Sequence, residues 1–208
     1  MANPHPSPSE LRFSPDIPDI WAHVSASAFP AASADESSAS RRVTGSVVLI
    51  DGASGTGKTS LAAHLASRWP ENRTVVVVHM DDLYGGWTGL AAGILALDVS
   101  LFGPRSRGGE AHLRAYNWGT GRWEDGPTIA AHVDVIVEGC GSFGAAESPS
   151  SAARIWLDAP LDARRQRALS RGGEDFDRHW DAWEKQFEQY ERRTQPVSIA
   201  SLRVSAKR

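Results

Sequence analysis

The sequence predicts an α/β fold in which a parallel sheet of about five strands carries helices on both faces. Short apolar runs rich in β-branched residues alternate along the chain with segments of helical period. Such alternation indicates strand–helix–strand crossovers, which are right-handed and lay helices on both faces of a parallel sheet. A glycine-rich segment, residues 52–59, separates the first apolar run from the first helical segment.

The expected elements follow one another closely along the chain. Pro70 ends one helix, because a proline cannot continue it, and Pro160 opens another. Residues 84–126 are the hardest part of the chain to interpret, although 89–102 has a helical pattern. Strands are expected at 46–50, 74–79, 133–137, 154–157 and 202–204, and helices at 58–69, 89–102, 160–173 and 174–193.

Residues 1–42 differ in composition from the rest of the chain. They are rich in Pro, Ser and Ala, and 31–40 has the composition of a disordered linker. They are expected to form an N-terminal extension, partly disordered or docked on the surface, with a short helix at 19–28. Residues 43–208 are expected to form a single domain.

Composition excludes several classes of protein. The 208 residues carry a net charge of −3, so the chain lacks the broad basic excess of a generic nucleic-acid binder. The single cysteine, Cys140, cannot build a disulfide framework or a zinc cluster. No apolar run approaches the ~20 residues of a membrane helix, and the N-terminus has no signal-like segment. A soluble, cytoplasmic protein is therefore expected.

Residues 52–59 read Gly-Ala-Ser-Gly-Thr-Gly-Lys-Thr and match the pattern G-x-x-x-x-G-K-[ST]. The glycines let successive backbone N–H groups turn inward around a phosphate, and the helix that follows adds the positive end of its dipole. Lys58 can reach the β- and γ-phosphates, and the Thr59 hydroxyl can ligate Mg²⁺. We therefore expect a P-loop NTPase three-layer sandwich that binds ATP and Mg²⁺. The expected nucleotide-binding residues of the loop are Gly52, Ser54, Gly55, Thr56, Gly57, Lys58, Thr59 and Ser60.

Other segments narrow the class of P-loop protein. The guanine-reading N-K-x-D segment of GTPases does not occur in the sequence. The loop continues G-K-T-S, whereas nucleoside monophosphate kinases commonly read G-K-G-T. Helicases and AAA-type motors usually end the Walker B strand with two acids, whereas here the strand at 133–137 is followed by Glu-Gly.

Three segments beyond the loop carry a resemblance to a known family. Residues 80–84, Met-Asp-Asp-Leu-Tyr, follow the second strand, and 137–139, Val-Glu-Gly, close the third. They are similar to the D-S-F-Y and F-E-G of the uridine kinase group of small-molecule P-loop kinases, which includes phosphoribulokinase and bacterial pantothenate kinase. Residues 116–118, Tyr-Asn-Trp, are similar to the group's Y-D-F or Y-D-W, with asparagine replacing the aspartate and no histidine following. The resemblance covers residues 46–193.

Asp81, Glu138 and Lys58 are the expected catalytic residues. Asp81 follows a parallel strand at the edge where α/β sheets bind ligands, and it matches the group's catalytic aspartate. It is therefore expected to take the proton of an acceptor hydroxyl, with Asp82 as the alternative base or a cap of the next turn. Glu138 ends an apolar strand, where a carboxylate is costly unless paired or metal-bound. Glu138 and Thr59 are expected to hold Mg²⁺, and an ordinary strand-end acid contacting a loop amide is the alternative.

Arginines of the region 161–175 are expected to close over ATP as a lid. Arg164, Arg167 and Arg171 recur at i, i+3 and i+7 and so share one helix face. The resemblance implies lid arginines here, and Arg167 and Arg171 are the preferred phosphate-binding residues. Arg165 is expected to point elsewhere. The alternative is a solvated helix face paired with nearby acids.

Two tyrosines and two arginines are candidates for binding the acceptor. The resemblance implies that Tyr84 and Tyr116 bind the acceptor. Arg114 and Arg122 are candidates for binding an anionic group of the acceptor, or are surface charges.

Aromatic residues fall into two groups. Those at helical spacing in 174–193 are expected to be core packing or a dimer seam. They are Phe176, Trp180, Trp183, Phe187 and Tyr190. Three tryptophans in less regular sequence are candidates for stacking on a ring, or are ordinary packing. They are Trp87, Trp118 and Trp123.

The resemblance implies an enzyme that transfers the γ-phosphoryl of ATP to a hydroxyl of a small metabolite, a nucleoside-like acceptor being favoured. Two alternatives stay open. One is a nucleoside monophosphate kinase, and the other is a non-catalytic ATP-binding regulatory switch. The expected partner is a small-molecule acceptor, with no nucleic acid and no membrane, and the chain is expected to be a monomer or a homodimer. The sequence does not identify the acceptor.

Overall fold

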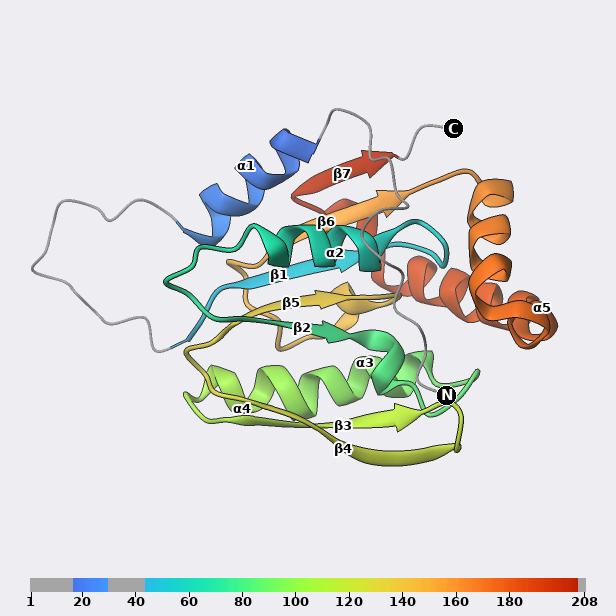
Figure 1. Ribbon diagram of the computed structural model, residues 1–208, viewed down its shortest axis with the longest axis horizontal. Helices are drawn as coiled ribbons and strands as arrows, with labels where there is room; N and C mark the ends of the chain where they lie inside the picture. Colours follow the sequence, from blue (N-terminus) through green and yellow to red (C-terminus); the bar gives the residue numbers. More distant parts are fainter. Residues whose placement is uncertain (1–16, 30–43, 206–208) are drawn as a thin grey trace, which may run out of the picture.

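The strands of the described residues form a five-stranded parallel sheet and a separate two-stranded hairpin (Figure 1). The computed structural model describes residues 17–29 and 44–205. The order across the large sheet is β2-β5-β1-β6-β7, and each neighbouring pair is parallel, which confirms the predicted sheet. Its strands are β1 (Val47–Asp51), β2 (Val75–His79), β5 (Asp134–Glu138), β6 (Ala153–Asp158) and β7 (Leu202–Ser205).

Helices cover both faces of the sheet, as the sequence predicts (Figure 1). The second predicted helical pattern, 89–102, is a helix that widens into a π-helical turn at Asp98–Phe102. None of the helices in the described ranges is both long and apolar enough to cross a bilayer. The helices are α1 (Ile17–Ala28), α2 (Lys58–Ser67), α3 (Leu90–Leu97), α4 (Gly103–Ser106), α5 (Leu161–Thr194) and α6 (Pro196–Ile199).

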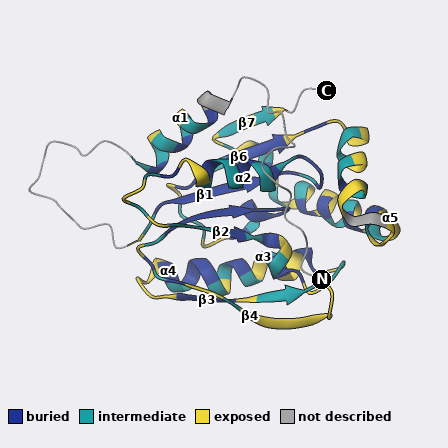
Figure 2. Ribbon diagram, in the orientation of Figure 1, coloured by how far each residue is buried: buried dark blue, intermediate teal, exposed yellow. Residues whose placement is uncertain are grey.

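Side chains of the central strand β1 pack into two separate hydrophobic cores. Its side chains alternate between the faces of the sheet, as those of any strand do. Val48 and Ile50 pack with Leu61 of α2 on one face, whereas Val47 and Leu49 belong to the core on the other face, with α3 and α5. Figure 2 shows β1 and β5 buried along their length, which explains the apolar residues at their centres.

Helix α1 packs on the same face as α2. It starts two residues before the predicted helix at 19–28. Ile20 and Val24 are buried in the core under this face. Phe29 packs edge-on against Trp69, with 5.0 Å between the ring centroids. The predictions for residues 1–16 and 30–43 lie outside the described residues.

The hairpin of β3 (Ala111–Asn117) and β4 (Arg122–Ile129) was not predicted from the sequence. The two strands are antiparallel, and most of β4 is exposed, so it lacks the apolar run of a buried strand. The Asn117 side chain closes the turn, because its Oδ1 accepts hydrogen bonds from the backbone N–H groups of Gly119 and Thr120, at 3.0 and 3.1 Å.

Helix α5 folds back on itself. In a straight helix, residues 164 and 184 would lie about 30 Å apart along the axis. Yet the Arg164 guanidinium lies 2.9 Å from a carboxylate oxygen of Glu184, and that of Arg165 lies 3.2 Å from Asp177. The helix therefore reverses between Arg165 and Asp177, and Figure 1 shows α5 turning sharply at the right edge of the molecule and running back toward the sheet.

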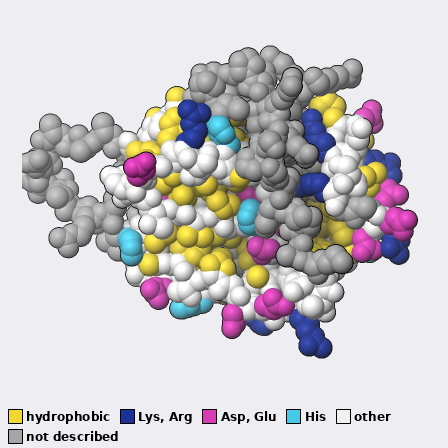
Figure 3. All heavy atoms as spheres, in the orientation of Figure 1, with side chains coloured by type: hydrophobic (Ala, Val, Ile, Leu, Met, Phe, Trp, Pro, Cys, Tyr) yellow, Lys and Arg dark blue, Asp and Glu magenta, His cyan; other side chains and the backbone are white. Residues whose placement is uncertain are grey.

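We call residues 161–171 the first limb of α5 and residues 174–194 its second limb. The prediction that one helix ends at Gly172–Gly173 and another begins is wrong for the backbone, because α5 continues from Leu161 to Thr194 without a break. The reversal nevertheless spans these two glycines, which suits a sharp change of direction. Basic and acidic side chains gather together over α5 in Figure 3.

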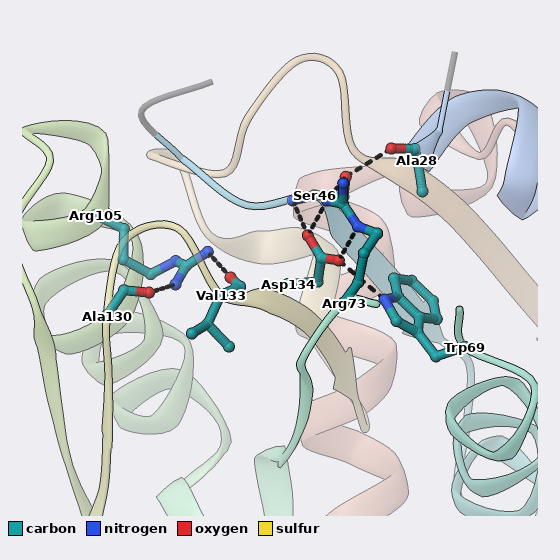
Figure 4. A network of polar contacts seen from close by, with 8 residues as sticks. All are labelled: Ala28, Ser46, Trp69, Arg73, Arg105, Ala130, Val133 and Asp134. Atoms are coloured by element: carbon teal, nitrogen blue, oxygen red, sulfur yellow. Dashed lines mark hydrogen bonds and ion pairs between the residues drawn. The ribbon is translucent and has the colours of Figure 1, made fainter. Parts of the chain in front are cut away.

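A buried polar network fixes the amino-terminal edge of β5, far from the ends of the strands that point to the site (Figure 4). Asp134 accepts two hydrogen bonds from Arg73, both at 2.6 Å, and one from the Trp69 indole at 2.9 Å. It also accepts the backbone N–H of Ser46, whose hydroxyl donates to the Ala28 carbonyl. The network ties α1, α2, β1 and β5 together at one corner of the sheet.

Candidate active site

A cavity of about 210 Å³ lies at the carboxyl ends of the central strands. Loops that follow β1, β2 and β5 meet there, as ligand sites do in open α/β sheets. The lining combines the glycine-rich loop, carboxylates and aromatic rings. It consists of Ser54, Gly55, Lys58, Thr59, Asp81, Tyr84, Trp87, Trp118, Glu138, Gly139, Cys140, Arg171, Asp175, Phe176 and Trp183.

Residues 52–59, the phosphate loop, connect β1 to α2 in the order the motif requires. Gly57, with φ of 100°, turns the backbone into the first residue of α2. The Lys58 ammonium donates to the Ala53 carbonyl at 2.9 Å, so its charge lies inside the loop. Of the residues expected to bind nucleotide, Ser54, Gly55, Lys58 and Thr59 line the cavity. Gly52, Thr56, Gly57 and Ser60 shape the loop or follow it without lining that cavity.

The first limb of α5 lies directly against the phosphate loop. Gly55 has a φ of 79°, and a Cβ atom there would overlap the backbone carbonyl of Arg164, so only glycine allows this approach. The Arg164 and Arg167 guanidiniums donate to the carbonyls of Ser54 and Gly55, each at 3.2 Å. The predicted lid region is thus in contact with the loop in this structure.

The expected lid arginines differ in their surroundings. Arg164 is held by Glu184 and lies over the Trp180 ring, 5.9 Å from its centroid. Arg171 lines the cavity, and Arg167 contacts the loop. Arg165 is exposed and paired with Asp177, which agrees with its expected orientation away from the site. Of these arginines, Arg171 lines the cavity, whereas Arg164 and Arg167 both contact the phosphate loop, and the phosphate-binding roles expected for Arg167 and Arg171 stay predictions.

Glu138 ends β5 beside Thr59 and His79. Its Oε1 accepts a hydrogen bond from the Thr59 hydroxyl at 3.0 Å and lies 2.6 Å from His79 Nδ1. His79 and Glu138 are register partners on β2 and β5, which explains the contact that the sequence did not predict. Burial would raise the pKa of Glu138, but the hydrogen bond and charge of His79, with the charge of Lys58, lower it.

The pair Thr59 and Glu138 fits a magnesium ion. An ionised carboxylate and a hydroxyl are hard oxygen ligands, and they stand next to each other at the end of the phosphate loop. Burial would lower the pKa of His79, but its hydrogen bond to Glu138 raises it instead. The imidazole therefore favours the ionised form of Glu138 that a cation needs.

Asp81 follows β2 in a single turn of 3₁₀-helix, Met80–Leu83, and lines the cavity. Desolvation within the cavity and the negative charge of Glu138 raise the pKa of Asp81, while Lys58 and Arg171 oppose the rise. Because Asp81 is exposed to the cavity, the charge of Glu138 contributes more than desolvation to its raised pKa. Asp82 does not line the cavity, so the geometry favours Asp81 as the base.

Five aromatic side chains form a wall beside Asp81. Trp87 lies at the centre of this group, with the rings of Trp118 and Phe176 at 5.0 and 5.2 Å between centroids. The Trp118 indole donates to the backbone carbonyl of Asp81 at 2.9 Å, which ties the wall to the candidate base. This aromatic wall consists of Tyr84, Trp87, Trp118, Phe176 and Trp183.

The helical aromatic stripe divides between core and cavity. Trp180, Phe187 and Tyr190 are at most 4% exposed within one chain, so they are core residues and are not available as a dimer seam. Phe176 and Trp183 line the cavity, a placement that the sequence did not predict. The spacing shows that they share a face, but the reversal of α5 decides what this face meets.

The predicted acceptor residues are split by the structure. Tyr84 lines the cavity, although its hydroxyl is already used, since it donates to the Cys140 carbonyl at 2.6 Å. Tyr116, Arg114 and Arg122 lie on the hairpin outside the lining of the cavity. Arg114 is exposed and donates to the Trp123 carbonyl at 3.1 Å. The roles expected for these three residues stay predictions.

Cys140 is buried, as expected of a small filler, but it also belongs to the site. Its Sγ lies 3.6 Å from both the Lys58 ammonium and the Ser54 hydroxyl. Burial raises the pKa of the Cys140 thiol, and the nearby charge of Lys58 only partly offsets this. The neutral thiol therefore forms part of the floor beneath the phosphate loop.

Solved structures of kinases share this architecture. The chain is similar to a possible uridine kinase from Bacillus stearothermophilus, at 22% identity over 77% of this chain and 88% of that one, with a TM-score of 0.53. It is also similar to a candidate fructose transport system kinase from Silicibacter sp. TM1040, at 16% identity over 90% and 98% of the two chains, with a TM-score of 0.51. No protein-family model and no curated protein sequence matches the chain. The fold is therefore P-loop kinase-like.

Proposed function

We propose that this protein is a kinase that transfers the γ-phosphoryl group of ATP to a hydroxyl of a small, ring-bearing metabolite without a phosphate of its own. One observation carries the proposal. The phosphate loop, the Asp81 carboxylate and the aromatic wall all line the same cavity. Phosphoryl transfer needs these parts together, because it depends on positioning the two substrates and neutralising charge.

The phosphate loop would bind the nucleotide. Its backbone N–H groups and the amino end of α2 favour an anion, and Lys58 supplies a positive charge inside the loop. Arg167 and Arg171 on the first limb of α5 would neutralise charge that develops on the transferring group. Thr59 and Glu138 would hold Mg²⁺, which neutralises phosphate charge when bound.

Asp81 would accept the proton of the acceptor hydroxyl. The hydroxyl oxygen forms a bond to the γ-phosphorus, the bond from that phosphorus to the β–γ bridging oxygen breaks, and ADP leaves. The proton passes to the Asp81 carboxylate. The raised pKa of Asp81 suits this role, since a more basic carboxylate accepts a proton more readily.

The aromatic wall limits the class of acceptor. Flat rings such as Trp87, Trp118 and Phe176 favour a ligand with a planar or apolar face, as nucleosides and sugars have. Among the described residues that line the cavity, the cations are Lys58 and Arg171, and both are needed by the nucleotide. An acceptor that already carries a phosphate would find no further cation there, which disfavours a nucleoside monophosphate kinase.

Matched pairs of acceptors test this proposal. The purified protein is incubated with Mg²⁺, ATP and one member of each pair, a nucleoside or sugar and its phosphate ester, and products are read by mass spectrometry. We expect phosphoryl gain on an unesterified member, and Trp118→Ala should weaken it. Gain only on the esters would favour a nucleoside monophosphate kinase. Nucleotide binding without transfer to any acceptor would favour a regulatory switch.

A further inference from the structure

Asp51 is a fully buried carboxylate that does not line the cavity. It is the last residue of β1 and immediately precedes the phosphate loop. Its two oxygens accept four hydrogen bonds. Oδ1 accepts from the backbone N–H groups of Gly52 at 2.7 Å and Gly141 at 2.9 Å. Oδ2 accepts from the Phe143 backbone N–H at 2.9 Å and from the Tyr190 hydroxyl at 2.6 Å.

The four donors belong to three parts of the candidate site. Gly52 is the first residue of the phosphate loop. Gly141 and Phe143 belong to the segment that directly follows Glu138. Tyr190 lies on the second limb of α5, whose first limb bears the arginines that contact the loop. A single side chain therefore fixes where these three parts stand relative to one another.

A carboxylate suits this position because it only accepts hydrogen bonds. All four groups around it are donors, so the amide nitrogen of an asparagine would face a donor at one of them. Burial raises the pKa of Asp51, and the four hydrogen bonds offset this rise only in part. An ionised group is kept in the interior only where such bonds replace its water. Each lost donor therefore weakens the whole arrangement.

We infer that Asp51 and Tyr190 are a positioning pair, which holds the phosphate loop in register with the segment after Glu138. The register matters because the loop carries Thr59 and the neighbouring strand carries Glu138. The Thr59 hydroxyl and Glu138 Oε1 lie 3.0 Å apart. For its bearing on catalysis this inference rests on the proposed function. Its physical content, the shared anchoring of two segments, does not depend on any bound ligand.

Tyr190→Phe tests the inference, since it removes one hydroxyl and leaves a ring of the same shape in the core. The matched control is Val24→Ala, which removes buried methyl groups from α1 on the opposite face of the sheet. Both variants lower stability, but only the first reaches Asp51. The full chain is used for all three proteins, without ligand, and amide hydrogen exchange is followed by mass spectrometry.

We expect exchange to rise together in residues 52–58 and 139–143 of Tyr190→Phe, by about tenfold, and to stay unchanged there in Val24→Ala. Unchanged exchange in either segment of Tyr190→Phe would overturn the inference. An equal rise in Val24→Ala would also overturn it, because the effect would then be a general loss of stability.

Calorimetric titration with Mg²⁺ and ADP gives a second readout. Affinity should fall about fivefold to tenfold in Tyr190→Phe and change less than twofold in Val24→Ala, because a misplaced loop meets the phosphates less well. Equal affinities in wild type and Tyr190→Phe would contradict the link to the site. A wild-type protein that bound no nucleotide would refute the proposed function, while the exchange experiment would still decide the anchoring role.

Discussion

At the scale of single residues, the candidate site sets opposite charges next to each other at the ends of neighbouring strands. Glu138 lies between a hydroxyl and an imidazole, Lys58 lies within the phosphate loop, and Asp81 lines the cavity. Each position has one physical requirement: Glu138 must be an ionised carboxylate, Lys58 a fixed cation and Asp81 an accessible base. Substitutions that keep size but change charge separate these requirements.

Lys58→Ala should abolish transfer while leaving the fold intact. The ammonium of Lys58 bonds to the loop carbonyl of Ala53, so its loss removes charge at the phosphates without opening the core. Thermal unfolding and nucleotide titration measure the two effects separately. Near-normal ATP affinity and turnover in the variant would show that residues 52–59 do not act as a phosphate loop.

Asp81→Asn should reduce turnover by about 10²–10⁴-fold, the usual effect of losing acid–base assistance, with little change in ATP affinity. Steady-state kinetics with a responsive acceptor measure both. Asp82→Asn is the matched control, since Asp82 is adjacent but does not line the cavity. If only Asp82→Asn lost activity, the assignment of the base would be reversed. An effect of Asp81→Asn on ATP affinity alone would place Asp81 beside the metal.

At the scale of elements, the reversal of α5 brings two functions to one helix. Its first limb lays arginines on the phosphate loop, and its second limb supplies Phe176 and Trp183 to the cavity. The ion pair of Arg164 with Glu184 joins the limbs at 2.9 Å. A movement of the first limb would therefore alter the phosphate side of the cavity while the second limb, held in the core by Trp183, Phe187 and Tyr190, stayed in place.

The double variant Arg167→Ala, Arg171→Ala should lose turnover more than ATP affinity, because these cations act mainly on charge in the transition state. Comparison of kcat with the dissociation constant for ATP measures the difference. Arg165→Ala is the control, since Arg165 lies exposed on the same limb and pairs with Asp177. Equal losses in the control, or none in the double variant, would assign these arginines to a solvated helix face.

At the scale of the whole molecule, the candidate site and the Asp134 network lie at opposite ends of the sheet. The phosphate loop and carboxylates lie at the carboxyl ends of the strands, whereas the Asp134 network lies at the amino end of β5 (Figure 4). Stability and function therefore depend on different buried carboxylates. Changes at Asp134 should alter unfolding more than nucleotide binding.

Asp134→Asn should lower the free energy of unfolding by about 2 kcal/mol at neutral pH, because Asp134 is buried while its partner Arg73 is partly exposed to solvent. Burial would raise the pKa of Asp134, but its bonds to Arg73, Trp69 and Ser46 lower it. The folded pKa thus lies below the unfolded one, near 3.9. This stabilisation is fully present above the unfolded pKa and is lost as pH falls through the folded pKa.

Urea unfolding between neutral pH and pH 3 measures this contribution, with tryptophan fluorescence as one probe. The wild type should lose stability faster than Asp134→Asn as the pH falls. Parallel curves for the two proteins would contradict the assignment of the acid-sensitive contribution to Asp134.

The sequence predicted those parts of the molecule that local signals determine. The phosphate loop, the five parallel strands and the placement of Asp81 and Glu138 at the carboxyl ends of their strands follow from periodicity and short motifs. The partner of Glu138, His79, depends on the register between β2 and β5, which no local pattern specifies. The hairpin was missed because its second strand is exposed and lacks an apolar run.

Of the aromatic wall, the sequence indicated Tyr84, Trp87 and Trp118 as candidates but not Phe176 and Trp183. Phe176 and Trp183 have the spacing of a packing stripe, and only the reversal of α5 brings them to the cavity. No sequence motif indicates the role of Asp51, because its four hydrogen-bond donors lie on segments far apart in the chain.

The fate of the γ-phosphoryl group tests the central claim most directly. ATP labelled at the γ-phosphate is mixed with Mg²⁺, a ring-bearing acceptor identified with the matched pairs, and wild-type protein or Asp81→Asn, and the label is followed over time. We predict that the wild type moves the label mainly onto the acceptor and that Asp81→Asn does so at least about a hundredfold more slowly. Label that appears only as inorganic phosphate, at the same rate with and without acceptor, would contradict the account.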